Sequence, residues 1–162
     1  MEKFQELRET AKKKISIADH MLTQTYPLIK DPKLLLAIIE NIFLALTNAI
    51  GSVLYYERLF KKIPPFQDNF PSKFNMFRTR CVQRHNINKD YIDLVSDVKS
   101  IIIKHKKSPV EFTRKDSFVI CSENYKMKII SLEEIKNYLD KTKLFIQEVS
   151  SIVSKNENIF NS

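Results

Sequence analysis

A single glycine, Gly51, occurs in this chain of 162 residues. Glycine takes positive φ angles most readily, and phosphate-binding loops, dinucleotide fingerprints and many-turned β-sandwiches need such angles at several positions. The scarcity of glycine therefore excludes these designs and favours long helices. A chain of this length suits one domain that removes roughly 70% of its unfolded surface from water.

Apolar residues recur at steps of three and four over residues 4–28, which is the period of one helix face. Tyr26-Pro27 and Asp31-Pro32 are expected to end this helix, because a residue that precedes proline disfavours the helical conformation. Asp31 is then predicted to be the N-cap, with Pro32 in the first turn, of a second helix that extends to residue 62.

This second helix is mostly apolar from Leu34 to Tyr56, which raises the question of a membrane span. Glu40, Asn41 and Asn48 interrupt the run, and a central glutamate costs more than several leucines recover on insertion. We therefore expect the central helix of a soluble bundle and no contact with a membrane.

Four polar residues of the same helix, Asn41, Asn48, Ser52 and Tyr55, lie at helical spacing with Gly51 beside them. We call these four residues the polar seam. Such a narrow stripe is typical of a partly solvated face or of a contact between two copies of a chain. We take the second interpretation as an expectation, which makes the protein a homodimer.

Residues 63–71 contain three prolines and are predicted to form a non-helical connection. Ser72 can cap a short helix that follows. Phe74, Phe77 and Cys81 would lie on the buried side of this helix, where both phenylalanines are expected to fill the core.

The spacing of the apolar residues changes toward the C-terminus. Asn88 is predicted to cap a helix that ends at Ser108-Pro109. The β-rich runs at 118–121 and 125–130 predict a hairpin over about 117–130. Ser131 begins a capping box that opens the final helix.

Taken together, these patterns predict a mainly α fold. We expect an antiparallel four- or five-helix bundle in one domain over residues 1–155, with a small β hairpin before the last helix. Residues 156–162 are expected to be a disordered tail.

Positive charge is concentrated in the middle of the chain. The net charge is +8 in total, and residues 63–115 hold eleven basic and five acidic residues, whereas residues 116–162 hold six and seven. A basic surface of this kind attracts phosphates, or else is simply a solvated face. The candidate nucleic-acid-binding residues are Lys73, Arg78, Arg80, Arg84, Lys99, Lys104, Lys106, Lys107, Arg114 and Lys115.

Arg80 and His85 form an R-x4-H pattern. A histidine can act as general acid or base near neutral pH, and a guanidinium can stabilise a phosphorane-like transition state, so this pair suits RNA cleavage. The structural alternative is a surface arginine and a histidine at a helix end. His105, six residues after Lys99, is a third catalytic candidate. The structural alternative is that His105 is a core residue on the apolar face of its helix.

Cys81 and His85 stand four residues apart and would supply half of a metal site, with Cys121 as a third ligand. No C-x-x-C or H-x3-H pair completes the set, so we expect no metal and no cofactor. Two cysteines and a charged N-terminal stretch favour a reducing, cytoplasmic location.

The order of helices resembles that of the HEPN superfamily of small α-helical bundles. The local sequence is also similar to archaeal helical proteins of this kind at 26–33, at Tyr56-Glu57-Arg58, at 105–112 and at 114–116. The resemblance implies a dimer in which R-x4–6-H residues meet at the interface to cleave RNA; other members only bind. Late in the helix after the middle segment, where the family places this motif, the chain has Lys99 and His105 and no arginine.

Three hypotheses follow. The first is an RNA-associated protein that binds through its basic middle region without catalysis. The second is a dimeric, non-catalytic module that holds a protein partner through the polar seam or the edge of the hairpin. The third is a metal-independent endoribonuclease that uses Arg80 and His85, or Lys99 and His105.

Overall fold

The computed structural model describes residues 1–107, 110–114, 116–121 and 127–155. Within this part the chain is mainly helical, as predicted. The long helices are α1 (Lys3–His20), α3 (Pro32–Leu59), α6 (Asp90–Lys107) and α7 (Leu132–Val153), and the short ones are α2 (Tyr26–Ile29), α4 (Phe70–Met76) and α5 (Val82–Arg84). π-Helical turns at Met21–Thr25 and Phe77–Cys81 join α1 to α2 and α4 to α5.

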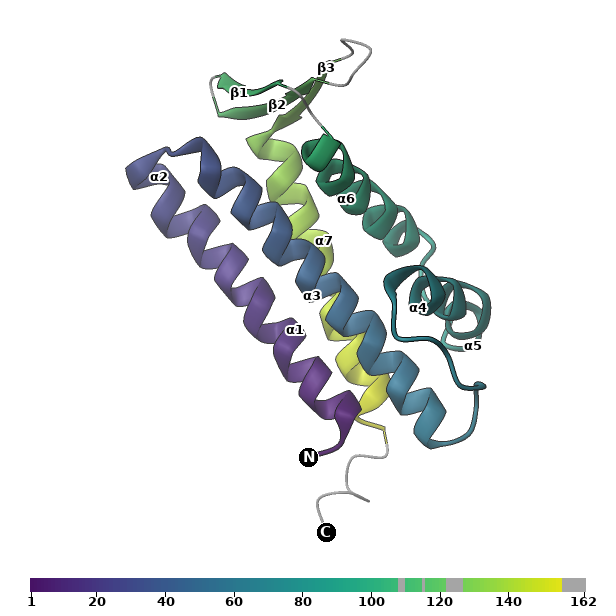
Figure 1. The fold of residues 1–162 in the computed structure, drawn as a ribbon. Coiled ribbons are helices and arrows are strands. Elements are labelled where there is room, and N and C mark those ends of the chain that lie inside the picture. The colour runs from purple at the N-terminus through teal and green to yellow at the C-terminus, as the bar shows by residue number, and fades with distance from the viewer. Residues whose placement is uncertain (108–109, 115, 122–126, 156–162) are drawn as a thin grey trace.

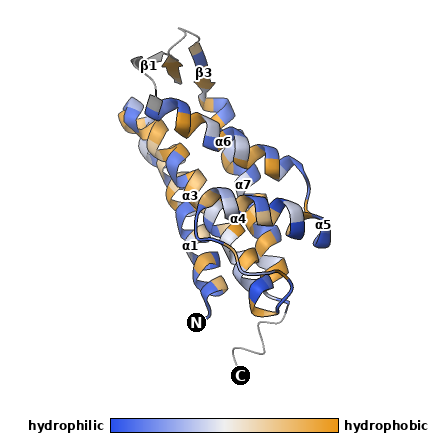
Figure 2. Cartoon of the chain, turned by 45° about the vertical axis from the view of Figure 1, so that its right-hand side comes forward, coloured by the Kyte–Doolittle hydropathy of each residue, from blue (hydrophilic) through white to orange (hydrophobic). Residues whose placement is uncertain are grey.

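Helix α3 is central and packs against α1, α6 and α7. Figure 1 shows that α1 and α3 run in opposite directions, whereas α7 runs in the same direction as α3. The buried apolar side chains form one cluster that extends from Phe4 to Val153. Hydrophobic and hydrophilic residues alternate along the helices (Figure 2), as expected of helices that bury one face.

Among the described residues, α3 is the one helix long and apolar enough to cross a membrane, with a mean hydropathy of 1.9 over its most apolar window. Half of that window is buried inside the protein. The same helix carries two buried polar side chains, Ser52 and Glu57. Both make hydrogen bonds to other parts of the chain.

The side chains of the polar seam make contacts within the chain. Ser52 is fully buried, and its hydroxyl donates to the Phe4 carbonyl oxygen of α1 at 2.7 Å. A Cβ at Gly51 would lie 3.1 Å from Leu7 Cδ1, so this glycine lets α1 approach α3 closely. The expectation that Ser52 contacts a second copy is therefore corrected, because α1 covers it.

The other members of the polar seam are half-buried. Asn41 and Asn48 each donate to a carbonyl one turn earlier in α3, those of Ala37 and Leu44, at 2.9 Å and 2.7 Å. Tyr55 packs edge-on against Phe66.

The hairpin predicted before the last helix is confirmed and belongs to a three-stranded antiparallel sheet. Its strands are β1 (Val110–Arg114), β2 (Ser117–Cys121) and β3 (Met127–Ser131), in that order. Strand β1 was not expected, because it is short, carries two charged residues and reads as part of a linker. Residues 108–109, 115, 122–126 and the predicted tail at 156–162 lie outside the described residues.

The sheet lies at one end of the helical body (Figure 1) and is joined there to α2 and to the start of α7. Phe118 and Ile130 are paired across β2 and β3 and buried. The Tyr26 hydroxyl donates to Asp116 Oδ1 at 2.8 Å, and the Asp116 carbonyl accepts from the Leu132 amide at 3.0 Å. Burial and the Asp116 carboxylate raise the pKa of Tyr26 to about 12.

Polar caps begin several helices, and residues with left-handed backbone follow α2, α3 and α5. Asp31, Asn88 and Ser131 each accept a backbone N–H in the first turn of the helix that they were predicted to cap. Helix α4 begins earlier than predicted, because Asn69 is its cap and accepts from the Ser72 amide. Within the described residues, every positive φ angle falls on a residue other than glycine: Lys30, Lys61, Asn86 and Asp116.

Candidate nucleic-acid interface

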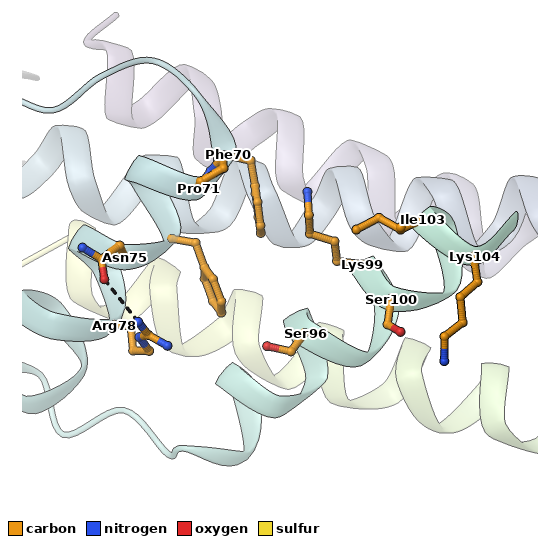
Figure 3. A pocket seen from close by; sticks show the side chains of 10 residues that line it. Phe70, Pro71, Asn75, Arg78, Ser96, Lys99, Ser100, Ile103 and Lys104 are labelled. Atoms are coloured by element: carbon orange, nitrogen blue, oxygen red, sulfur yellow. Dashed lines mark hydrogen bonds between the residues drawn. The ribbon is translucent and has the colours of Figure 1, made fainter. Parts of the chain in front are cut away.

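A groove of about 500 Å³ lies between α4 and α6 (Figure 3). Helix α4 and the π-helical turn after it supply one wall, and successive turns of α6 supply the other. The lining residues are Phe70, Pro71, Phe74, Asn75 and Arg78 from the first wall and Ser96, Lys99, Ser100, Ile103 and Lys104 from the second. We refer to this feature as the groove.

Two phenylalanines form the apolar wall of the groove. The rings of Phe70 and Phe74 stack with centroids 5.3 Å apart and planes 17° from parallel. Their spacing of four residues places them on one side of α4. On its far side Phe70 contacts Phe43 of α3, with centroids 5.4 Å apart. Phe77 fills the core as predicted, whereas Phe74 is half-buried, packs against the core and also lines the groove.

Three cations, Arg78, Lys99 and Lys104, line the groove together with these rings, and among the described residues no acidic side chain lines it. Lys99 Nζ lies 4.1 Å from the centroid of Phe70, and the two side chains face each other in Figure 3. Arg78 donates to Asn75 Oδ1 at 3.2 Å. In the part of the chain that the structure describes, no carboxylate lies within 4.0 Å of the cationic groups of Arg78, Lys99 or Lys104. The groove is therefore apolar and carries uncompensated positive charge.

The other predicted nucleic-acid-binding residues are spread over the molecule. Lys73 forms an ion pair with Asp68, Arg84 pairs with Glu57, and Arg80 and Lys106 are exposed. Lys107 and Arg114 belong to α6 and β1, but their side chains lie outside the described part, as does all of Lys115. The structure thus gathers Arg78, Lys99 and Lys104 around one site.

The catalytic candidates are not brought together. Arg80 is exposed on the π-helical turn, whereas the His85 ring turns inward to Glu57. His105 lies beside Phe118 of the sheet, with ring centroids 6.0 Å apart, whereas Lys99 lies over Phe70. Six residues of α-helix rotate by roughly 600°, so Lys99 and His105 cannot share a face of α6.

His85 and its neighbour Arg84 share a buried carboxylate, and we call Glu57, Arg84 and His85 the Glu57 cluster. Glu57 is 1% exposed. Its Oε2 accepts from Arg84 Nη1 at 2.5 Å, and its Oε1 contacts His85 Nε2. Arg84 also donates to the Lys62 carbonyl at 3.3 Å. Both carboxylate oxygens are used within the chain, so the cluster fastens α5 to the end of α3.

Glu57 was not among the candidate site residues, although the sequence carries a signal for it. Ile50, Val53, Leu54 and Glu57 follow the i, i+3, i+4, i+7 spacing of a buried helix face. A charge at such a position needs a partner, because burial of an unpaired carboxylate is costly. The partner stands 27 residues away, and the spacing does not identify it.

Cys81 is fully buried beside the Glu57 cluster. Burial and the negative charge of Glu57 raise the pKa of the Cys81 thiol to about 12. In the described residues, no group of three or more His, Cys, Asp and Glu side chains is placed to hold a metal ion.

We expect Cys81 to resist alkylation by iodoacetamide in the native chain at pH 8, because only about one thiol in ten thousand is then ionised and the sulfur is buried. Peptide mass spectrometry should find Cys81 modified only after unfolding in guanidinium. A raised pKa also means that the stability contributed by the protonated thiol is lost as the pH rises from about 9 toward 12. Rapid labelling of Cys81 in the folded chain would contradict this account.

Comparison of the chain with protein-family models, with curated proteins and with solved structures gives no match in any of the three.

Proposed function

We propose that this chain is a HEPN-like, antiparallel helical bundle that binds single-stranded RNA in the groove between α4 and α6. The observation that carries the proposal is the stacked Phe70–Phe74 pair, in a groove that three cations also line, none of which has an acidic partner among the described residues. Cations attract the phosphates of any nucleic acid, whereas exposed aromatic faces stack on bases only when those bases are unpaired. The combination therefore favours a single strand over a duplex.

The polar side chains of the groove support the same ligand. Ser96, Ser100 and Asn75 also line it, and their hydroxyl and amide groups can reach base edges or sugar oxygens. A simple anion would use the cations but not the aromatic wall, and an apolar ligand would leave the cations unused.

Binding without cleavage is the form of this function that the geometry favours. Cleavage by the predicted pair requires Arg80 and His85 to face one substrate, but the His85 ring is held by the buried Glu57 carboxylate, whereas Arg80 is exposed. The homodimer and the cytoplasmic location expected from the sequence remain part of the proposal.

A fluorescence-anisotropy titration with a labelled 12-mer of uridine tests the proposal. In 50 mM salt we expect saturable binding that unlabelled 12-mer displaces, with weaker displacement by a blunt RNA duplex of the same length. Polyglutamate serves as a control for charge alone. Absence of binding at this low salt, or equal displacement by duplex and single strand, would overturn the proposed function.

A further inference from the structure

The groove does not end at Phe70. This side chain also lines a second hollow of about 310 Å³, which lies on the opposite side of it against α3. The second hollow is lined by Phe43, Thr47 and Gly51 of α3 and by Lys73 of α4, among others. One aromatic residue therefore forms the wall between two adjoining sites.

A row of residues along α3 continues from this hollow. Phe43, Thr47, Gly51 and Tyr55 are spaced by four residues and lie along one side of the helix. Gly51 is buried against Leu7 of α1, so the row reaches the surface at Phe43, Thr47 and Tyr55. From Phe43 to Tyr55 is twelve residues, or about 18 Å along the helix axis. Tyr55 in turn lines a third hollow of about 320 Å³.

Cations accompany the aromatic rings along this row. Lys73 Nζ lies 5.8 Å from the Tyr55 centroid, and Lys3 Nζ lies 6.0 Å from it on the same ring. Tyr55 packs on Phe66, with centroids 5.3 Å apart, and the Arg58 guanidinium lies 5.5 Å from the Phe66 centroid. Three cations, Lys3, Arg58 and Lys61, and one carboxylate, Glu2, line the third hollow.

Two acidic residues stand on this path, Glu2 in the third hollow and Asp68 in the second. Asp68 lines the second hollow, and its exposed carboxylate is paired with Lys73. The hydrogen bond from Lys73 and the charge of Lys73 lower the pKa of Asp68, so the carboxylate is ionised at neutral pH. Asp68 is therefore paired with Lys73, the cation that lines the second hollow and lies near the Tyr55 ring.

We propose that the groove, the second hollow and the third hollow form one continuous track for a single strand of RNA, in which Asp68 holds Lys73 and weakens binding. The proposal rests on the proposed function. A stacked strand rises about 3.4 Å per nucleotide, so the 18 Å along α3 add roughly five nucleotides to those held in the groove.

The length of the oligonucleotide tests the track. A uridine 12-mer offers about nine registers to a four-nucleotide site, so a groove acting alone would favour the 12-mer over a 4-mer by that statistical factor only. We expect the 12-mer to bind at least fiftyfold more tightly. Tyr55→Leu should weaken the 12-mer at least fivefold and leave the 4-mer unchanged, since the 4-mer needs only the groove.

Asp68→Asn should strengthen binding of the 12-mer several-fold and steepen its salt dependence, because Lys73 is then released to a phosphate. A gain in affinity cannot arise from misfolding, and a thermal melt checks that Tyr55→Leu remains folded. If the affinities of the 12-mer and the 4-mer differ by a factor near nine and both variants bind as wild type does, the proposed track is wrong, whereas the proposal of binding in the groove is retained. If neither length binds, the proposed function itself fails.

Discussion

Replacement of both Arg84 and His85 by alanine is expected to lower the free energy of unfolding by about 3 kcal/mol, because the buried carboxylate of Glu57 then loses both of its side-chain partners. Glu57 is 1% exposed and cannot turn toward water without displacement of the end of α3. The midpoint of thermal unfolding should fall by roughly 6–12 °C, at 2–4 °C for each kcal/mol in a chain of this size.

A third substitution separates the cost of the buried charge from the cost of lost packing. Glu57→Met, added to the double variant, removes the carboxylate and keeps most of the side-chain volume. We expect the triple variant to recover at least half of the lost stability, since apolar replacement of a whole buried cluster is often neutral. Urea unfolding followed by circular dichroism measures all three chains. A triple variant less stable than the double would show that the Glu57 cluster is not held by charge.

Phe74→Leu is expected to weaken binding of the uridine 12-mer by roughly 5- to 150-fold, because stacking of one base on an aromatic ring contributes about 1–3 kcal/mol. Leucine keeps an apolar side chain in the groove but offers no flat face to a base. The loss should appear in the dissociation constant from anisotropy at fixed salt.

Tyr91→Leu is the matched control for Phe74→Leu. Tyr91 is also half-buried and lies on α6, but its ring packs on Phe145 and it does not line the groove. We expect its effect on the dissociation constant to stay within twofold. Equal losses in the two variants would mean that the effect arises from general loosening of the helices.

The parts of the fold that follow from local chemistry were predictable. Asp31, Asn88 and Ser131 cap the helices predicted for them, because a cap is set by a few adjacent residues. Strand β1 was missed although it pairs with β2 in the adjacent sequence, because it is short and carries two charged residues. The distribution of charge indicated the middle of the chain, and three of the ten predicted basic residues line the groove.

The roles of individual residues near α4 were not predictable from an ideal helical period. The π-helical turn at Phe77–Cys81 adds a residue to one turn, which changes the angle between residues on either side of it. Phe77 and Cys81, at the two ends of this turn, are both buried, whereas Phe74, before the turn, is half-buried and lines the groove. His85 contacts Glu57, which lies 28 residues earlier in the sequence, and no local sequence pattern predicts that contact.

The central claim is that Arg78, Lys99 and Lys104 bind the phosphates of a single strand. The most direct measurement is the slope of log affinity against log salt for the uridine 12-mer, compared between wild type and a chain in which all three are glutamine. Each lost phosphate contact should lower the slope by about 0.7, so we predict a decrease of roughly 2. Glutamine at the exposed residues Lys13, Lys136 and Lys141 removes the same charge and should leave the slope nearly unchanged. Equal slopes for wild type and the groove variant would contradict the claim.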